Sequence, residues 1–284
     1  MKVVALMIVR NEEDCLPRCL EHLAEQGLQA AVIDNGSTDR TPDILASFAP
    51  RVVVHVEPAP FHGVFEWSKL LAQAGRMQRG LDADWFHMNS PDEIMNSQRP
   101  GERLLDAVRR VDAAGFTAIN YEEFVFLPVD EKMSGAGQAF DRLLRHYYFY
   151  APSPLRQMRT WKNQPGLSNV DSGGHHLQGP DIRLYPENLV LRHYIALSAD
   201  QFRRKYAGRI FPPQELAKGW HANRVNIDTR QIRLPPRSRL KELTSGDLSA
   251  LDRSDPWTRH FWEMEQPGPP GFLARLFRRQ ARGS

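Results

Sequence analysis

Two stretches of the chain decide its fold: VVALMIVRNEED, from Val3 to Asp14, and AVIDNGSTDRT, from Ala31 to Thr41. The first opens with an unbroken β-branched and apolar run, which is typical of a strand covered on both faces of a parallel sheet. The acidic residues after it are typical of the first turn of a helix, and Gly27 is the expected helix stop. This stretch therefore predicts a strand followed by a helix.

The second stretch repeats that pattern. A buried strand over 30–33 ends in the polar turn Asp34 to Asp39, and Thr41-Pro42 supplies an N-cap followed by proline at the first helical position. Strands and helices continue to alternate, with strands expected over 51–56, 85–88 and 118–121 and helices over 64–79 and 101–114. The alternation predicts an α/β fold with a mostly parallel central sheet, helices on both faces and ligands at the carboxyl ends of the strands.

The second half of the chain is less regular. Prolines and glycines punctuate residues 127–186, which we expect to form long active-site loops with short elements. A strand over 189–194 and a helix through Lys205, begun by Ser198, follow. We expect a single domain in three parts: an α/β half over 1–126, a loop-rich region over 127–235, and a C-terminal extension over 236–284.

Composition narrows the class of protein. The 284 residues carry a net charge of +3, which does not favour nucleic-acid binding, and only Cys15 and Cys19 are present, so a reducing cytoplasm is the expected setting. No apolar run is long enough to span a bilayer. The segment Phe272 to Arg279 reads as a short basic amphipathic tail, which either contacts the inner membrane face peripherally or is an ordinary packed or disordered terminus.

The residues that end the first two strands resemble the opening of family 2 glycosyltransferases, which have the GT-A fold, a Rossmann-like nucleotide-binding architecture. In that family the first loop and the acid after the second strand hold the base and ribose of the nucleotide. The resemblance carries this role to Arg10, Asn11, Glu12, Asp34 and the adjoining Asn35. A structural alternative for Asp34 is an Asx-type turn that only caps the following helix.

The segment WFHMNSPDE, Trp85 to Glu93, resembles the metal-binding segment of the same family, a strand that runs into Asp-x-Asp. Ser90 takes the first Asp position, Asp92 takes the second, and Glu93 follows. With His193 from the later LRHY segment, they form the expected site for Mn²⁺ or Mg²⁺, which bridge diphosphates through hard oxygen ligands. Because Ser90 removes one acid, a hydroxyl or water would have to substitute there. A zinc site built from His175, His176 and His193 is disfavoured.

An inverting transfer requires a carboxylate that takes the proton of the acceptor hydroxyl. Glu122 and Glu123 are the leading pair, and Asp171 is a third candidate. If the strand that begins at Ala118 continues through Phe126, only one of the two glutamates faces the site. The structural alternative for each acid is an ion pair with arginine. Cations expected near the diphosphate or an anionic acceptor are Arg156, Arg159 and Lys162.

The resemblance implies a glycosyltransferase that moves a sugar from a nucleotide-diphosphate donor, with UDP the expected nucleotide, to a glycan or lipid-linked acceptor in cell-surface polysaccharide assembly. The alternative is a non-catalytic nucleotide-sugar or glycan-binding protein that retains the fold, as Ser90 permits. A nucleotidyltransferase is disfavoured because Arg10-Asn11-Glu12 stands where its glycine-rich, lysine-containing phosphate loop is expected.

Overall fold

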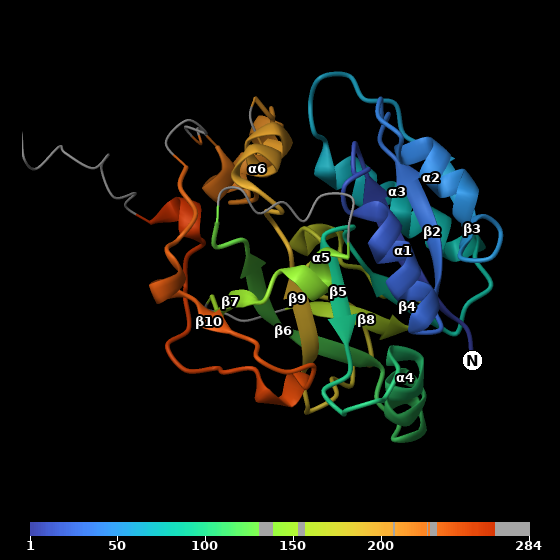
Figure 1. Cartoon of the computed structure of the whole chain (residues 1–284). Coiled ribbons are helices and arrows are strands. Elements are labelled where there is room, and N and C mark those ends of the chain that lie inside the picture. The colour runs from blue at the N-terminus through green and yellow to red at the C-terminus, as the bar shows by residue number, and fades with distance from the viewer. Residues whose placement is uncertain (131–138, 153–156, 207, 226, 228–231, 265–284) are drawn as a thin grey trace, which may run out of the picture.

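Four parallel strands form the first part of the sheet, in the order β3-β2-β1-β4 (Figure 1). They are β1 (Val3–Val9), β2 (Gln29–Asp34), β3 (Val53–Pro58) and β4 (Trp85–Met88). Val9 pairs with Asp34, so the polar residues that follow β1 and β2 leave the sheet at the same edge. The computed structural model describes residues 1–130, 139–152, 157–206, 208–225, 227 and 232–264.

Helices cover both faces of these strands, as the α/β pattern predicts. Alternate residues of β1 point to opposite faces, so Val3, Ala5 and Met7 join one apolar cluster while Val4 and Leu6 join another. The first cluster includes side chains from α1 (Leu16–Glu25), α2 (Thr41–Phe48) and α4 (Leu104–Ala113), and the second includes side chains from α3 (Trp67–Gly80). The mostly apolar strands are therefore buried from both sides.

Beyond β4 the sheet continues with antiparallel and mixed pairings. β8 (Met158–Lys162) lies antiparallel between β4 and β6 (Ala118–Leu127). The second half of β6 pairs with β7 (His146–Tyr150) on one side and runs parallel to β9 (Leu189–His193) on the other. Two short strands complete the sheet: β5 (Glu93–Asn96), which pairs with β9, and β10 (Lys241–Glu242), which pairs with β7.

The described part of residues 127–186 is more ordered than the sequence predicts. It contains the short elements α5 (Phe140–Leu143), β7 and β8, and two of them are strands of the central sheet. These strands are short and rich in aromatic and β-branched residues, and the prolines and glycines that mark loops lie outside them. β6 is also longer than the predicted strand, because its apolar and aromatic side chains remain buried through Leu127.

The remaining helices and turns of the described residues are short. They are α6 (Ala199–Tyr206), α7 (Pro213–Ala217), and the 3-10 turns η1 (Val170–Ser172), η2 (Ala222–Arg224), η3 (Arg237–Arg239), η4 (Leu248–Ala250) and η5 (Phe261–Glu263). The Ser198 hydroxyl accepts a hydrogen bond from the Gln201 N–H, as the cap predicted there requires. None of the helices in the described ranges has the length and apolar character needed to span a bilayer. The predicted tail over 272–279 lies outside the described residues.

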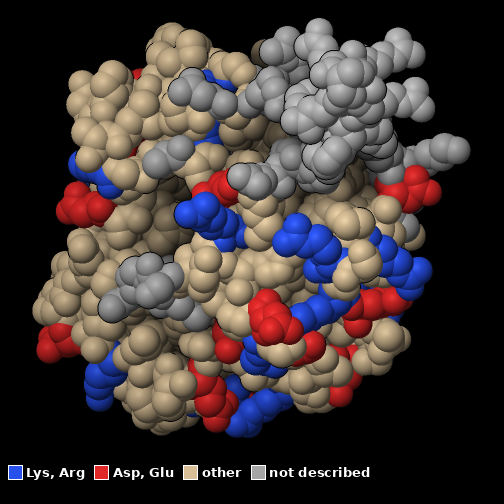
Figure 2. Space-filling view, turned by 90° about the vertical axis from the view of Figure 1, so that its left-hand side faces the viewer, with Lys and Arg blue, Asp and Glu red and all other residues tan. Residues whose placement is uncertain are grey.

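Charged side chains of both signs are mixed over the face shown in Figure 2. Elsewhere in the described residues, exposed charges of opposite sign form ion pairs, such as Arg237 with Glu242 at 2.7 Å. Exposed pairs of this kind contribute little to stability. Buried charged side chains, in contrast, gather near the carboxyl ends of the parallel strands.

Gly27 ends α1 in the manner that the sequence predicts. Its φ is +79°, and the N–H of Leu28 donates to the carbonyl of Leu23 at 2.8 Å, which is the closing bond of a Schellman motif. A Cβ at this position would lie 2.9 Å from Cδ2 of Leu105 on α4. The glycine therefore permits both the left-handed turn and the close packing of α4 on α1.

Gly27→Ala should lower the free energy of unfolding by about 2 kcal/mol, because it adds a steric conflict to left-handed backbone strain. Gly101→Ala is the matched control, since Gly101 has a φ of +74° but open space around its Cβ position. That control should lose only about 1 kcal/mol, the backbone term. Urea unfolding measures both, and equal losses would show that the contact with Leu105 has no energetic weight.

Candidate active site

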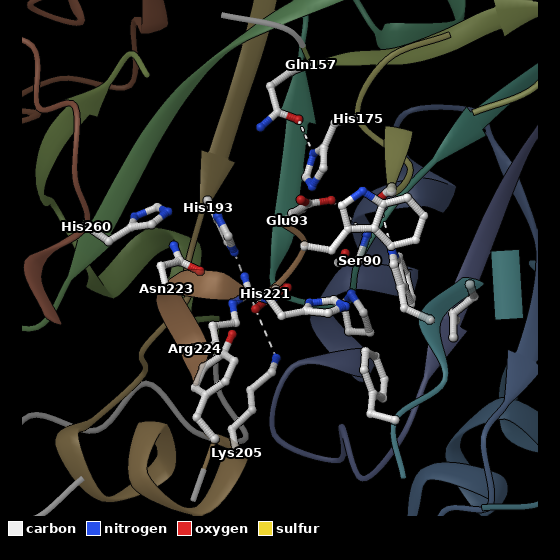
Figure 3. Close-up of a pocket in the computed structure, with 18 of the residues that line it drawn as sticks. Ser90, Glu93, Gln157, His175, His193, Lys205, His221, Asn223, Arg224 and His260 are labelled. Atoms are coloured by element: carbon white, nitrogen blue, oxygen red, sulfur yellow. Dashed lines mark hydrogen bonds and ion pairs between the residues drawn. The ribbon is translucent and has the colours of Figure 1, made fainter. Parts of the chain in front are cut away.

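A cavity of about 730 Å³ opens at the carboxyl ends of β1, β2 and β4. Its wall combines residues that follow the parallel strands, such as Arg10 and Asp92, with residues of the second half of the chain, such as His193 and Lys205. Figure 3 shows Lys205 and Arg224 on one side of this space and Gln157 and His175 on the opposite side. A ligand here would be contacted by both halves of the chain.

Hydrogen bonds join the loop after β1 to the loop after β2. Arg10 Nη1 donates to the carbonyl oxygens of Asn35 at 3.0 Å and Gly36 at 2.6 Å, and its guanidinium lies 3.6 Å from the centre of the Phe61 ring. Asn11 Oδ1 accepts the N–H of Thr38 at 2.8 Å. Arg10 lines the cavity, but Asn11 is exposed and is not among the lining residues. Asn11 therefore shapes the two loops without reaching the cavity.

Asp34 makes the Asx-type turn that was the structural alternative for it. Its Oδ1 accepts the N–H of Ser37 at 3.0 Å and the Ser37 hydroxyl at 2.6 Å, and Asp34 is not among the residues that line the cavity. Asn35 does line it. The Asn35 amide nitrogen donates to the carbonyl of Ala59 at 2.9 Å, while its buried Oδ1 has no hydrogen-bond partner among the described residues. Asn35 thus offers an unused acceptor at the place where the family resemblance predicts the nucleotide.

Both carboxylate oxygens of Glu93 accept hydrogen bonds from other residues of the protein. One of its carboxylate oxygens accepts from Arg159 Nη2 at 2.9 Å and the other accepts the N–H of Ser90 at 2.9 Å. The Glu93 and Arg159 side chains are only 3% and 6% exposed. Arg159 is therefore held by Glu93, and Lys162 is held by Asp112 at 2.6 Å, so neither cation is free to clamp a diphosphate as predicted. Arg156 lies outside the described residues.

Lys205 joins two predicted site acids. Its ammonium lies 3.0 Å from Asp92 Oδ2 and 2.9 Å from Glu12 Oε1, and all three side chains are largely buried. Burial alone would raise the pKa of Asp92, but the nearby Lys205 and His193 outweigh it and lower that pKa. Burial likewise opposes the charged form of Lys205, yet Asp92 and Glu12 raise the pKa of the ammonium well above its usual value. The pairing thus favours the charged forms of Asp92 and Lys205, whereas burial outweighs the attraction of Lys205 and raises the pKa of Glu12.

His193 extends this network to a third carboxylate. Its Nδ1 lies 2.6 Å from Glu123 Oε1 and its Nε2 lies 3.5 Å from Asp92 Oδ2. Burial lowers the pKa of His193, but the hydrogen bonds and charges of the two carboxylates raise it well above the ordinary value. Burial would raise the pKa of Glu123, and His193 overrides it to bring that pKa to about 2. The result is an imidazolium between two carboxylates.

The predicted metal ligands Asp92, Glu93 and His193 are not arranged as a coordination set. Both His193 nitrogens face carboxylates, Glu93 is held by Arg159, and the Lys205 ammonium already occupies the space between Asp92 and Glu12. In the described ranges, no group of three His, Cys, Asp or Glu side chains could hold a metal ion. The donors present do not fit Mn²⁺ or Mg²⁺ in this arrangement.

The length of β6 decides between the two candidate glutamates. Glu123 faces the cavity, where it also accepts from Gln157 Nε2 at 2.8 Å, whereas Glu122 points to the other side and pairs with Arg253 at 2.7 Å. Asp171 is exposed in η1 and does not line the cavity. Of the three predicted base candidates, only Glu123 is placed at the site.

Several lining residues were missed by the sequence analysis. Gln157 binds both Glu123 and His175, the latter at 3.1 Å, and His260 reaches the cavity from the C-terminal extension, where its Nδ1 bonds the Tyr148 hydroxyl at 2.9 Å. Arg209 also lines the cavity. No local motif marks these positions, because each depends on contacts between segments that are distant in sequence.

Comparisons with known proteins agree with the motifs at the N-terminus. Residues 4–63 match the family model described as glycosyl transferase family 2. A TPR repeat-containing protein of Synechococcus elongatus is 37% identical over 83 residues, which are 29% of this chain and 20% of that protein. The chain thus spans one fifth of the curated relative that it matches.

Two solved structures illustrate the structural comparison. TarS of S. aureus in complex with UDP has a TM-score of 0.42 and 12% identity, with 69% of this chain and 61% of that chain covered. Glucosyl-3-phosphoglycerate synthase from Mycobacterium tuberculosis, in complex with Mn²⁺, UDP and glucosyl-3-phosphoglycerate, has a TM-score of 0.29 and 13% identity, with 44% of each chain covered. The chain covers less than two thirds of either structure.

The matched segment contains both opening motifs, from the end of β1 through the turn after β2. Residues 4–63 are therefore similar to glycosyl transferase family 2, as the resemblance of those motifs predicts.

Proposed function

We propose that the protein is an inverting glycosyltransferase that transfers a sugar from a UDP-linked donor to a hydroxyl of a glycan or lipid-linked acceptor. The observation that carries the proposal is the composition of one cavity. Asn35, after β2, contributes a side-chain oxygen that has no hydrogen-bond partner among the described residues. Glu123 contributes a buried carboxylate that pairs with His193 from the second half of the chain.

The nucleotide end of the cavity fits a uracil base. Uracil carries a ring N–H donor between two carbonyl groups, and an amide oxygen such as Asn35 Oδ1 is a suitable acceptor for it. A buried acceptor without a partner costs free energy, so a ligand that supplies the missing donor gains affinity. Arg10 stabilises the backbone that presents Asn35, and this supports the role of the first loop in nucleotide binding.

The other end of the cavity supplies the proton acceptor for transfer. In the proposed step the acceptor oxygen attacks the anomeric carbon, its proton passes to Glu123, and the bond from the anomeric carbon to the diphosphate oxygen breaks with its electron pair. His193 and Gln157 hold Glu123 in place. The Tyr150 and Trp220 rings border the same cavity and offer apolar surfaces on which sugar rings can stack.

Glu123→Gln should reduce sugar transfer by roughly 10²- to 10⁴-fold, because the amide cannot take the acceptor proton. UDP binding should remain, since Glu123 contacts the acceptor side. Glu122→Gln is the matched control and should keep its activity, because Glu122 points away from the cavity. The measurement is UDP release from a panel of UDP-sugars, with UDP affinity measured by calorimetry. A wild-type protein that binds UDP but releases none from any sugar would support the alternative, a non-catalytic binding protein.

Asn35→Ala should weaken UDP binding by about tenfold, the value of roughly one hydrogen bond to a buried group. Wild-type protein should prefer UDP to CDP, because cytosine has a ring acceptor where uracil has the N–H donor. The variant should lose most of that preference. Calorimetric titration with both nucleotides tests this, and an unchanged ratio of affinities would remove Asn35 from base recognition.

A further inference from the structure

Two arginines of the cavity lie on the same aromatic ring. The guanidinium carbons of Arg209 and Arg224 are each 5.2 Å from the centre of the Tyr206 ring, and Arg209 is also 4.6 Å from the centre of the Phe65 ring. Both arginines line the cavity. Tyr206 ends α6, one residue after Lys205, so the two guanidiniums lie next to the Lys205 network.

Neither of these two cations has a carboxylate partner, which distinguishes them from Lys205, Arg159 and His193. Glu12 and Asp92 pair with Lys205, Glu93 pairs with Arg159, and Glu123 pairs with His193. No ion pair joins Arg209 or Arg224 to an acid in the ranges that the structure describes. Three cations, Lys205, Arg159 and His193, thus face the four cavity carboxylates. The further guanidiniums of Arg10, Arg209 and Arg224 give the cavity an excess of positive charge, which favours an anionic ligand.

The position expected for a divalent metal is itself held by a protein cation. Ser90 stands where the metal-binding segment of the family has its first acid, and the Lys205 ammonium contacts Asp92, which takes the second position. An ammonium and a metal ion cannot occupy this space together, because each needs the same carboxylate oxygens. The Lys205 ammonium at the expected metal position and the two arginines without carboxylate partners both supply positive charge where the diphosphate of a donor would bind.

We propose that Arg209 and Arg224 bind the diphosphate of the donor and stabilise it as leaving group, so that Lys205 and these arginines replace a divalent metal. This inference rests on the proposed function and deepens it. A guanidinium is planar and presents paired N–H donors, which match phosphate oxygens well. When the bond from the anomeric carbon to the diphosphate oxygen breaks, the oxygen keeps the electron pair, and the guanidinium N–H groups stabilise the new charge.

Aromatic packing gives these arginines a defined position before the ligand binds. Tyr206 is buried and lies 4.7 Å, between ring centres, from the fully buried Phe202 of the same helix. A guanidinium that lies over an aromatic face keeps its N–H edges free for hydrogen bonds in its own plane. A diphosphate has oxygens on two phosphorus atoms, and so it can meet both arginines at once.

The test is calorimetric titration of the full chain with UDP and with uridine, each in EDTA and in Mn²⁺. Wild-type protein should bind UDP equally well in both conditions. Arg209→Gln and Arg224→Gln should each weaken UDP binding by about tenfold to a hundredfold and leave uridine binding unchanged. Arg79→Gln, an exposed arginine of α3 outside the cavity, is the matched control. Arg209→Lys and Arg224→Lys, which keep the charge, should recover part of the affinity, and thermal unfolding reports whether each variant folds.

The outcomes separate this inference from the proposed function. UDP binding that requires Mn²⁺ and disappears in EDTA overturns the metal-free clamp but leaves the glycosyltransferase proposal intact. Arginine variants that fold and bind UDP like wild-type protein also overturn it. A wild-type protein that binds no UDP in either condition overturns both proposals, because the cavity then has no nucleotide to hold.

Discussion

The site depends on the buried ammonium of Lys205 between Glu12 and Asp92. Charges removed from water carry a large desolvation cost, so each of these three groups is tolerated only while the others are in place. The pairs join the end of β1, the end of β4 and helix α6, which are far apart in sequence. His193 and Glu123 continue the chain of charges to β9 and β6. The relative position of the two halves of the molecule at the cavity is thus set by electrostatic pairing as well as by the sheet.

The N-terminal half could be predicted because its structure follows from local patterns. The apolar runs of β1 and β2, the proline after Thr41 and the stop at Gly27 each act within a few residues, and the elements form where these signals lie. The N-cap of α2 is Arg40 and not the predicted Thr41, whose hydroxyl instead accepts the N–H of Glu12 at 2.9 Å. Glu122 and Glu123 show the limit of such reasoning. Strand alternation predicts that only one can face the site, but the choice depends on how β6 pairs with β9 and β7, which no local pattern contains.

The remaining features of the site could not be predicted because they arise from long-range contacts. Lys205 and Asp92 are 113 residues apart, and the sequence around Lys205 resembles an ordinary exposed helix end. The same holds for the C-terminal extension, whose Trp257 stacks on Tyr148 at 4.2 Å between ring centres. That packing brings His260 to the cavity wall, so part of the extension belongs to the site.

The place of β8 in the sheet has a consequence for how the chain folds as it is made. β8 lies between β4 and β6, yet it follows both of them in the sequence. When residues 1–126 leave the ribosome, the facing edges of β4 and β6 still lack the strand that will join them, and their backbone N–H and C=O groups are open to pairing with other chains. This stage lasts until residue 162 has emerged, because only then can β8 close the gap between β4 and β6.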